Sequence, residues 1–313
     1  MASFDVVGIG ACAVDYLGIV SELPSPDTKK RMKQFIRQGG GPASTALVAL
    51  SRLGASVSYI GKFGDDELSR FTLDEFDKEG VDTSHIIREE GAGPTFAFVI
   101  VDEKSAERTV LWTDEQVSQV KQDEFKKEVI ASSGFVLLDE YRFESALAAG
   151  RIAKEAGVQV VLDAERPELP DMDKLVQITD ILIVPEEFAL GFGEGKDIES
   201  SAEILLGLGP RVVAVTLGAK GSFCKTADES FYQPAFQVEA VDTTGCGDVF
   251  HGGFTYGLLQ NWPLKVTAEF ASAVSALKCR ALGGRAATPT LDEMKAFLLE
   301  RGSEEINKKM ASL

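Results

Sequence analysis

The sequence has few cysteines and lacks any long apolar run. Its four cysteines, Cys12, Cys224, Cys246 and Cys279, are scattered without the paired spacing of a zinc site or a redox dithiol. That scatter favours a reducing compartment. The first residues lack a basic start followed by an apolar stretch of export length, and no run of about 18 apolar residues occurs elsewhere. We therefore expect a cytoplasmic protein that does not enter a membrane.

Positive charge is also scarce, because 32 lysines and arginines stand against 49 aspartates and glutamates. The net charge of -17 would repel the phosphate backbone of nucleic acids and the surface of anionic lipid. We expect neither as a partner, although a locally basic cleft could still bind a small anionic substrate. Hydrophobic residues make up 44% and charged residues 26% of the chain, which suffices for an ordinary globular core.

Short apolar runs alternate with amphipathic segments along the chain. Strands are expected at residues 5–9, 57–62, 134–138, 158–163, 181–184 and 212–217. Helices are expected at residues 43–53, 66–79, 145–156, 200–208, 248–259 and 263–282. This alternation predicts an α/β fold, in which a doubly wound, mainly parallel sheet carries helices on both faces. In a chain of 313 residues we expect one large domain with a small appended one.

Two stretches, residues 29–38 and 95–112, break this alternation. The second reads as two strands joined by a polar turn, and the two stretches could pair into a small sheet outside the main one. Both faces of its first strand are apolar, with Phe96, Phe98 and Ile100 on one and Ala97, Val99 and Val101 on the other. A lone hairpin is marginally stable in water, so the second face should pack on the main domain or on another subunit. We expect a two-fold homodimer through this sheet; an edge decoration without function is the alternative.

The glycine-rich start, residues 6–15, has the GxGxxA spacing of a dinucleotide-binding turn. Such a site requires a helix directly after the turn, whereas residues 16–26 carry two prolines and no sustained helical face. A strand followed by a loop that brings Asp15 to the carboxyl end of the sheet is the favoured interpretation. An NAD-dependent oxidoreductase stays open as a minor alternative.

Two further glycine turns flank predicted elements. Residues 38–44, QGGGPAS, lead into a helical segment, and consecutive glycines let the backbone approach a ligand that side chains would exclude. Residues 215–222, VTLGAKGS, end an apolar strand and expose amides at its carboxyl edge, where α/β folds bind ligands. The first turn could anchor a polyol and the second could line a nucleotide site. Either could also be a purely steric turn.

The most informative segment is residues 241–254, VDTTGCGDVFHGGF. Small residues leave several amides free to converge on an anion, and the positive end of the following helix points to the same place. Asp248 lies in the first helical turn, where a carboxylate can also act as an N-cap. Capping does not explain the glycines beside a second aspartate, Asp242, so we interpret Asp248 as catalytic.

Residues 242–248, DTTGCGD, resemble the DTxGAGD signature of the ribokinase-like (PfkB) carbohydrate kinases. Other matching segments follow in the family's order: the strand ending near Asp15, the turn at 39–41, KFGDD at 62–66, VTLGAKGS, and ALKCRALGGR at 276–285. The chain is most similar to the ketohexokinase and sulfofructose kinase branch. The resemblance implies one ribokinase-like kinase domain over residues 1–313, with a main sheet of about nine strands. It also implies a small β-sheet lid from residues 15–38 and 92–113.

The resemblance further implies roles for single residues, with ATP and Mg²⁺ as cofactors and a monovalent cation such as K⁺ near the anion-binding amides. Asp248 would be the general base, and the anion hole would consist of Gly245, Cys246 and Gly247. Substrate hydroxyls would be bound by Asp15, Gly40, Gly41 and Ser44, and the nucleotide by Thr216, Gly218, Gly221 and Gly247. The cation loop would include Asp242, Thr244 and Gly284.

Three positions depart from the family pattern. Ser44 replaces the usual asparagine after the glycine turn, which shortens a hydrogen-bonding arm and argues against ribose. The Asn-x-x-Glu motif is absent, with Glu186 and Ala189 at its two positions, so Glu186, Glu187 or another carboxylate should take over its metal role. Cys246 replaces the usual alanine; its amide still suits the anion hole, and its thiol could make the site sensitive to thiol reagents.

These residues fit phosphoryl transfer, which needs a hydroxyl aligned with the γ-phosphate and stabilisation of the charge on the transferring group. Asp248 would accept the hydroxyl proton. The expected activity is ATP-dependent phosphorylation of a small sugar or polyol, with a ketose favoured. Sulfofructose is an alternative, because Arg142 and the basic residues 29–31 could hold a sulfonate, although Trp112 stands where that branch has asparagine. A non-catalytic sugar or nucleotide sensor with the same fold is the other alternative.

Overall fold

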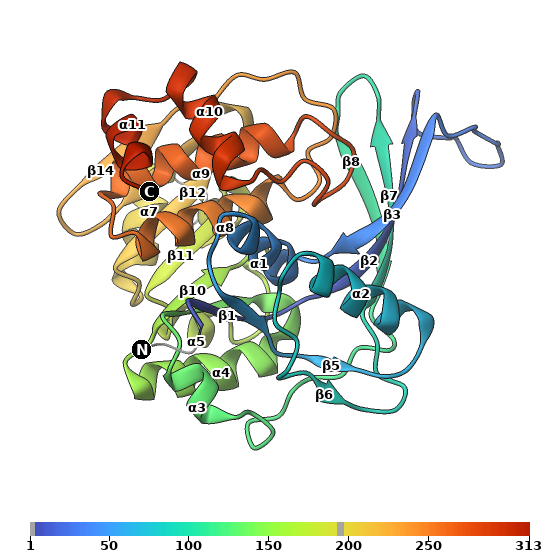
Figure 1. The fold of residues 1–313 in the computed structure, drawn as a ribbon, viewed down its shortest axis with the longest axis horizontal. Coiled ribbons are helices and arrows are strands. Elements are labelled where there is room, and N and C mark those ends of the chain that lie inside the picture. The colour runs from blue at the N-terminus through green and yellow to red at the C-terminus, as the bar shows by residue number, and fades with distance from the viewer. Residues whose placement is uncertain (1–3, 193–196) are drawn as a thin grey trace.

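The computed structural model describes residues 4–192 and 197–313. Eight strands form its central sheet in the order β14-β13-β12-β11-β10-β9-β1-β4 (Figure 1). Their bounds are β1 Val6–Ile9, β4 Val57–Tyr59, β9 Phe135–Asp139, β10 Gln159–Asp163, β11 Ile181–Pro185, β12 Val212–Thr216, β13 Ser222–Lys225 and β14 Ser230–Gln233. Neighbours from β4 to β12 pair in parallel, whereas β12, β13 and β14 pair antiparallel. The predicted doubly wound, mainly parallel sheet is confirmed, with eight strands where the resemblance implies about nine.

Helices cover both faces of the central sheet because its inner strands are apolar on both sides. The helices on one face are α1 Pro42–Arg52, α8 Cys246–Leu259, α9 Leu264–Lys278, α10 Leu291–Arg301 and α11 Glu304–Ala311. The helices on the other are α3 Lys127–Ala131, α4 Phe143–Ala156, α5 Met172–Gln177, α6 Glu186–Phe192 and α7 Ile198–Gly207. A further helix, α2 Glu67–Lys78, begins at the N-cap Asp66. It buries Phe76 in the hydrophobic core on the side of the sheet that α1, α8 and α9 cover.

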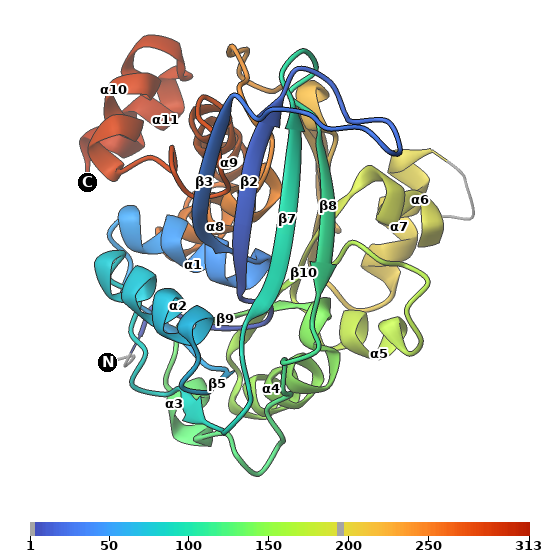
Figure 2. The same cartoon turned by 90° about the vertical axis from the view of Figure 1, so that its right-hand side faces the viewer.

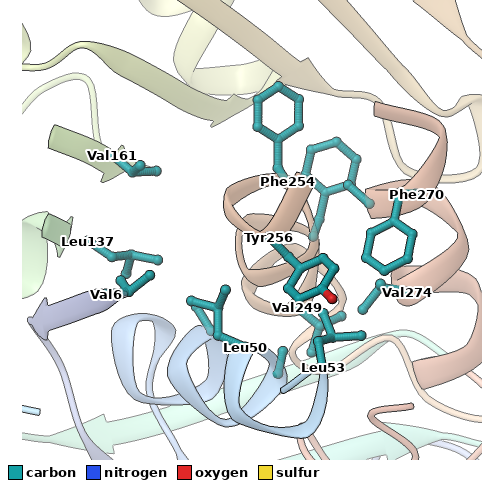
Figure 3. Packing of buried hydrophobic residues seen from close by; sticks show 14 of the residues in the cluster. Val6, Leu50, Leu53, Leu137, Val161, Val249, Phe254, Tyr256, Phe270 and Val274 are labelled. Carbon is teal, nitrogen blue, oxygen red and sulfur yellow. The ribbon is translucent and has the colours of Figure 1, made fainter. Parts of the chain in front are cut away.

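The glycines of α8 let this helix pack closely between α1 and α9. A Cβ at Gly252 would lie 2.8 Å from the carbonyl oxygen of Ala46, and one at Gly253 would lie 3.0 Å from the Cα of Ala271. Around these contacts, side chains of the three helices meet those of β1, β9 and β10 (Figure 3), among them Val6, Leu50, Leu137, Val161, Val249, Phe254, Phe270 and Val274. Contact on both sides fixes the position of α8, whose first turn carries the catalytic candidates.

A separate four-stranded sheet, the small sheet, lies beside the central one with the order β3-β2-β7-β8 (Figure 2). Its strands are β2 Ala13–Val20, β3 Gln34–Gly40, β7 Thr95–Asp102 and β8 Arg108–Thr113. β7 and β8 pair antiparallel, which confirms the hairpin predicted within residues 95–112. Val99 and Val101 of β7 are buried in a cluster with Leu17 and Leu282, so this face of the hairpin packs within the chain.

The opposite face of the small sheet carries aromatic side chains. The rings of Tyr16, Phe35, Phe96 and Phe98 contact one another, with centroid separations between 4.9 and 6.0 Å. Phe35 is nevertheless 53% exposed and Phe98 is 46% exposed. This outer face is therefore apolar and open to solvent in the single chain.

Three local predictions are wrong. The strand predicted at 57–62 breaks at residues 60–61, and its end forms β5 (Lys62–Phe63), which pairs with β6 (Ile87–Arg88) in a two-stranded sheet. The helix predicted at 263–282 ends at Lys278, because the chain then turns back so that the Gly283 amide donates to Asp242. Asp15, expected in a loop after the first strand, instead lies inside β2. Because this strand stands where a dinucleotide-binding turn needs a helix, the NAD alternative is removed. Within the described ranges, no helix has both the length and the apolar character needed to cross a membrane.

Candidate active site

The signature segment lies beside the carboxyl ends of β10, β11 and β12, at the start of α8. Gly245 is the N-cap of this helix and has a φ of 74°, a conformation that favours glycine. A Cβ at Gly245 would also lie 2.8 Å from the Cα of Gly284. The loop after α9 therefore contacts the signature backbone directly, and both glycines sit at that contact.

Asp242 holds these two loops together. Its carboxylate accepts hydrogen bonds from the amide and hydroxyl of Thr244, at 2.8 and 2.7 Å, and from the Gly283 amide at 2.7 Å. The fully buried Lys278 donates through Nζ to the Asp242 carbonyl at 3.0 Å. The structure thus brings together Asp242, Thr244 and Gly284, the residues predicted for the cation loop, and it occupies the Asp242 carboxylate with internal hydrogen bonds.

Asp248 is half-buried in the first turn of α8. Burial first, and then the negative charge of Glu165, raise the pKa of its carboxyl group to about 7, with Arg108 acting in the opposite direction. Burial likewise raises the pKa of the nearby Glu140 to about 8. A carboxylate with a pKa near 7 changes its protonation state at neutral pH, as a general base does.

A cavity of about 470 Å³, the signature cavity, is lined by Cys246 and Gly247 directly before Asp248, which is not itself a lining residue. Its walls include the predicted nucleotide residues Thr216, Gly218, Gly221 and Gly247, together with Cys246. Further lining residues that the sequence did not mark as site residues include residues 235–238, Ala240, Ser272, Ser275, Ala276 and Cys279. Ala276 and Cys279 fall in the segment 276–285 that matches the family pattern, but the sequence indicated no role for them, because only the fold brings this helix face and the loop before the signature together.

The predicted metal residues Glu186 and Glu187 start α6, directly after Pro185. Pro185 lines the signature cavity, but neither glutamate does, and Glu187 is exposed. Two other carboxylates, Asp163 and Glu165, do line it. In the part of the chain that the structure describes, no three or more His, Cys, Asp or Glu side chains group in a way that could hold a metal ion.

The predicted sugar-binding residues meet at the start of the small sheet. Asp15 of β2 is 7% exposed, and burial raises the pKa of its carboxyl group to about 6, partly offset by Arg285. A Cβ at Gly40 would lie 2.0 Å from the Asp15 Oδ2 atom, so glycine is required for this approach. Gly41 has a φ of 94° and caps α1. The structure thus confirms that Asp15, Gly40 and Gly41 are neighbours; their contact with a substrate stays a prediction.

Ser44 lies beneath this glycine turn and is fully buried. Its hydroxyl donates to the Gly40 carbonyl at 2.5 Å and accepts from Arg285 Nη2 at 2.8 Å. Arg285 Nη2 also donates to the Gly40 carbonyl at 3.0 Å. Ser44 therefore supports the turn from within the protein. Arg285, which the sequence marked only as the end of the segment 276–285, ties the turn to the loop after α9.

Arg142 is buried at the start of the small sheet, outside the signature cavity. Its guanidinium donates to Thr95 Oγ1 at 2.6 Å and to the Tyr141 carbonyl at 2.8 Å. It lines a separate, much smaller cavity with Cys12 and Tyr59. Arg142 thus lies at the start of the small sheet, as do the other predicted sugar-binding residues, and its contact with a substrate stays a prediction.

The turn between β7 and β8 contacts the signature. The carbonyl oxygen of Ala106 accepts hydrogen bonds from the Thr243 amide at 3.4 Å and from the Thr243 hydroxyl at 3.2 Å. Arg108, two residues further, lines the signature cavity. Charges on two strands of the small sheet thus act on Asp248: Arg108 lowers the pKa of its carboxyl group, and Asp15 raises it. The sequence did not single out Arg108.

His251, one turn along α8, lies between backbone carbonyls. Its Nδ1 lies 2.8 Å from the Gly247 carbonyl oxygen, and its Nε2 lies 3.1 Å from that of Ile183 and 3.4 Å from Asp163 Oδ1. Burial lowers the pKa of this imidazole and raises the pKa of Asp163. The ring therefore links the first turn of α8 to the ends of β10 and β11.

Comparison with known proteins shows which proteins the chain is similar to. Residues 3–291 match the sequence profile of the pfkB family carbohydrate kinases. The 5-dehydro-2-deoxygluconokinase of Clostridium botulinum is 29% identical, over 95% of this chain and 94% of its own. The ATP-dependent ribose-1-phosphate kinase of Halopiger xanaduensis is 31% identical, over 90% of this chain and 94% of its own.

The fold is shared with solved structures of similar length. The ribokinase of Thermotoga maritima superimposes with a TM-score of 0.82, covering 95% of this chain and 99% of that one. At 24% identity this likeness concerns the architecture alone. It includes both the central sheet and the small sheet beside it.

Proposed function

The chain belongs to the pfkB family of carbohydrate kinases, and from this we propose that Asp248 takes the proton from a sugar hydroxyl as that hydroxyl attacks the γ-phosphorus of ATP. The observation that carries the proposal is the place of Asp248. It lies in the first turn of α8, directly after Gly247 of the signature cavity, with its pKa raised to about 7 and with Arg108 and Asp15 of the small sheet among the charges that act on it. A base and an anion-binding helix end are thus adjacent.

The amides at the start of α8 are suited to the phosphate oxygens. A Cβ added at Gly247 would meet no protein atom within 4 Å, so the protein's own packing does not require glycine there. Glycine instead leaves room for a ligand to reach the backbone. With the positive end of α8 behind them, the amides of Gly245, Cys246 and Gly247 would stabilise charge on the transferring group.

The proton and bond changes are simple. The sugar hydroxyl loses its proton to Asp248, its oxygen forms a bond to the γ-phosphorus, and the bond from that phosphorus to the ADP oxygen breaks. Mg²⁺ is commonly held by one or two carboxylates together with substrate phosphates, and Asp163 and Glu165 are carboxylates that line the signature cavity. When bound, the ion would neutralise phosphate charge. We assign this role to Asp163 and Glu165 in place of Glu186 and Glu187.

We place the sugar between Asp15 and Asp248, against the glycine turn at Gly40 and Gly41. The names of the relatives cover different carbohydrates, so they support a small sugar as the acceptor without choosing one. A ketose remains our preferred substrate and sulfofructose the alternative. Because the guanidinium of Arg142 already donates hydrogen bonds to Thr95 and to the Tyr141 carbonyl, the sulfonate is the less supported of the two.

We also propose that the small sheet is a lid and that two chains associate through it. Its inner face carries Asp15 and Arg108 toward the site, as a cover would. Its outer face exposes Phe35 and Phe98, an apolar surface that a second copy of the same sheet could bury. A lid that closes over the sugar would exclude water from the phosphoryl group.

A direct assay tests the proposed function. The purified protein is given ATP, MgCl₂ and one compound at a time from a panel of ketoses, aldoses, sulfosugars, sugar phosphates and nucleosides, and ADP release and the phosphorylated product are measured. We expect one sugar to be phosphorylated far faster than ATP is hydrolysed alone. Binding of ATP and a sugar with no product would favour the non-catalytic sensor instead. The same panel with KCl replaced by a large organic cation tests the predicted monovalent cation.

A further inference from the structure

Two thiols from distant parts of the sequence meet beside the anion-binding amides. Cys246 is the first residue of α8, and Cys279 is the C-cap of α9. Their Sγ atoms lie 2.7 Å apart, whereas a disulfide bond is about 2.05 Å long. The packing of α8 on α9 therefore holds the two sulfurs within about 0.7 Å of bonding distance.

The place of this pair makes it reachable by small molecules. Cys246 and Cys279 are only partly buried, and both line the signature cavity. Cys12 and Cys224 are buried and are not among the residues that line it. A reagent that enters the cavity would thus meet one pair of thiols and not the other two.

We propose that Cys246 and Cys279 form a reversible disulfide when the protein meets a hydroperoxide, and that this bond stops phosphoryl transfer. In the first step one thiolate attacks the peroxide: an S–O bond forms, the O–O bond breaks, and water leaves when the oxidant is hydrogen peroxide. In the second step the other sulfur forms the S–S bond and expels hydroxide, which leaves as water after taking a proton. The two thiols lose two electrons and two protons in all, and peroxide becomes two molecules of water. An added dithiol reverses the change by thiol–disulfide exchange.

The bond would act on the catalytic residues through short connections. The carbonyl of Cys246 accepts a hydrogen bond from Ser275 Oγ at 2.6 Å, and Asp248 follows two residues later. The carbonyl of Cys279 accepts from the amides of Val241, at 2.8 Å, and Asp242, at 3.2 Å. Drawing the sulfurs together would shift the first turn of α8 and the signature loop relative to each other. Since a misplacement of about 1 Å can lower a rate about 100-fold, we expect turnover to fall at least about tenfold.

The test begins with the full-length protein, reduced and then treated with hydrogen peroxide. Intact mass should show the loss of two hydrogens, and peptide mapping should assign the cross-link to Cys246 and Cys279. Kinase turnover should fall in proportion to the cross-linked fraction and return after dithiothreitol. A non-hydrolysable ATP analogue should slow cross-linking, because it would occupy the cavity that both thiols line.

Single variants provide matched controls, each compared with its own reduced form. Cys246→Ala and Cys279→Ala should lose both the cross-link and the response to peroxide, whereas Cys224→Ala should keep both. Thiols that stay free after treatment, or a cross-link through Cys12 or Cys224, would overturn the site. A Cys246–Cys279 bond that leaves turnover unchanged would overturn the switch. Loss of turnover rests on the proposed kinase function, but bond formation does not: a cross-link slowed by the ATP analogue in a protein that phosphorylates no sugar would contradict the function and support the site.

Discussion

The signature loop and the small sheet contact each other through Thr243 and Ala106, yet they are held in place in different ways. In the signature loop the Asp242 carboxylate alone accepts three hydrogen bonds, and Lys278 binds its carbonyl. The small sheet has a minor apolar core and leaves aromatic rings on its outer face in solvent. Hydrogen bonds hold the signature loop in place. The small sheet, in contrast, needs contacts with surfaces outside itself to bury its aromatic face. We infer that the chemistry belongs to the first region and the choice and enclosure of substrate to the second.

The largest expected effect is at Asp248, which directly follows the signature loop. Asp248→Asn removes the proton acceptor with little change in volume, so the fold and ATP binding should persist while kcat falls by about 10² to 10⁴-fold. Asp228→Asn, at an exposed aspartate in the turn between β13 and β14, is the matched control and should behave as wild type. Steady-state kinetics and ATP titration measure both. If Asp248→Asn keeps a tenth of the wild-type kcat, another group is the base.

The next prediction concerns Arg285, which joins the glycine turn at the start of the small sheet to the loop after α9. Arg285→Met removes hydrogen bonds to the Gly40 carbonyl and to Ser44, each worth about 1.5 to 3 kcal/mol when the donor is charged. We expect the sugar KM to rise by about 10- to 100-fold with the ATP KM nearly unchanged.

Its control is Arg280→Met, which removes an exposed arginine from the same loop. General unfolding would lower the active fraction without changing either KM. An equal rise in both KM values would mean that Arg285 supports the whole cleft rather than the sugar side. The division of roles between the signature loop and the small sheet would then be wrong.

A third prediction tests the outer face of the small sheet. Phe98→Glu places a charge among the exposed aromatic rings, and disrupting an aromatic anchor of an interface usually weakens binding by 2 kcal/mol or more, about 30-fold in Kd. Sedimentation at micromolar concentration should show a dimer for the wild type and a monomer for the variant. Leu299→Glu, at an exposed leucine of α10, should leave the dimer intact. A wild type that sediments as a fully active monomer would remove the proposed dimer.

The smallest expected effect is a shift in pH dependence. Glu165 is the charge that most raises the pKa of Asp248, so Glu165→Gln should lower that pKa. Because the base must be ionised, kcat/KM should rise with pH through a midpoint near 7 in the wild type, and this acidic limb should move to lower pH in the variant.

The position of the limb can be read even if the variant is slower overall. The exposed Glu168→Gln is the control and should leave the limb in place. A limb that stays or moves to higher pH in Glu165→Gln would show that Asp248 does not titrate as described.

The contrast between the signature loop and the small sheet also explains which features could be predicted from the sequence. The signature was predictable because Gly245, Asp248 and their neighbours are consecutive, so one loop and one helix end place them. Gly40 was predictable because consecutive glycines precede a helical segment, whereas Asp15, which was expected in a loop after the first strand, lies inside β2. The alternation of strands and helices likewise predicted the central sheet, apart from the break at residues 60–61.

Residues that reach the site from distant parts of the sequence could not be predicted. Arg108, Glu165 and Arg285 reach the site from a hairpin, a strand end and a loop that are far apart in the sequence. Glu186 was chosen by its place in a family motif, but its side chain does not line the signature cavity. No local pattern carries such information, because it depends on which strand ends become neighbours. The pairing of Cys246 with Cys279 was missed for the same reason.

The crowding of carboxyl groups at the cleft has a consequence for stability. Folding raises the pKa values of Asp15, Asp248 and Glu140 to about 6, 7 and 8, whereas aspartate and glutamate in an unfolded chain titrate near 4. The folded protein therefore holds protons that the unfolded chain releases, and the stabilisation present below about pH 4 is lost as the pH rises through these values. We therefore expect the ligand-free protein to have its highest melting temperature in mildly acidic buffer. At the higher pH at which Asp248 is ionised for catalysis, the carboxylates of the cleft repel one another most.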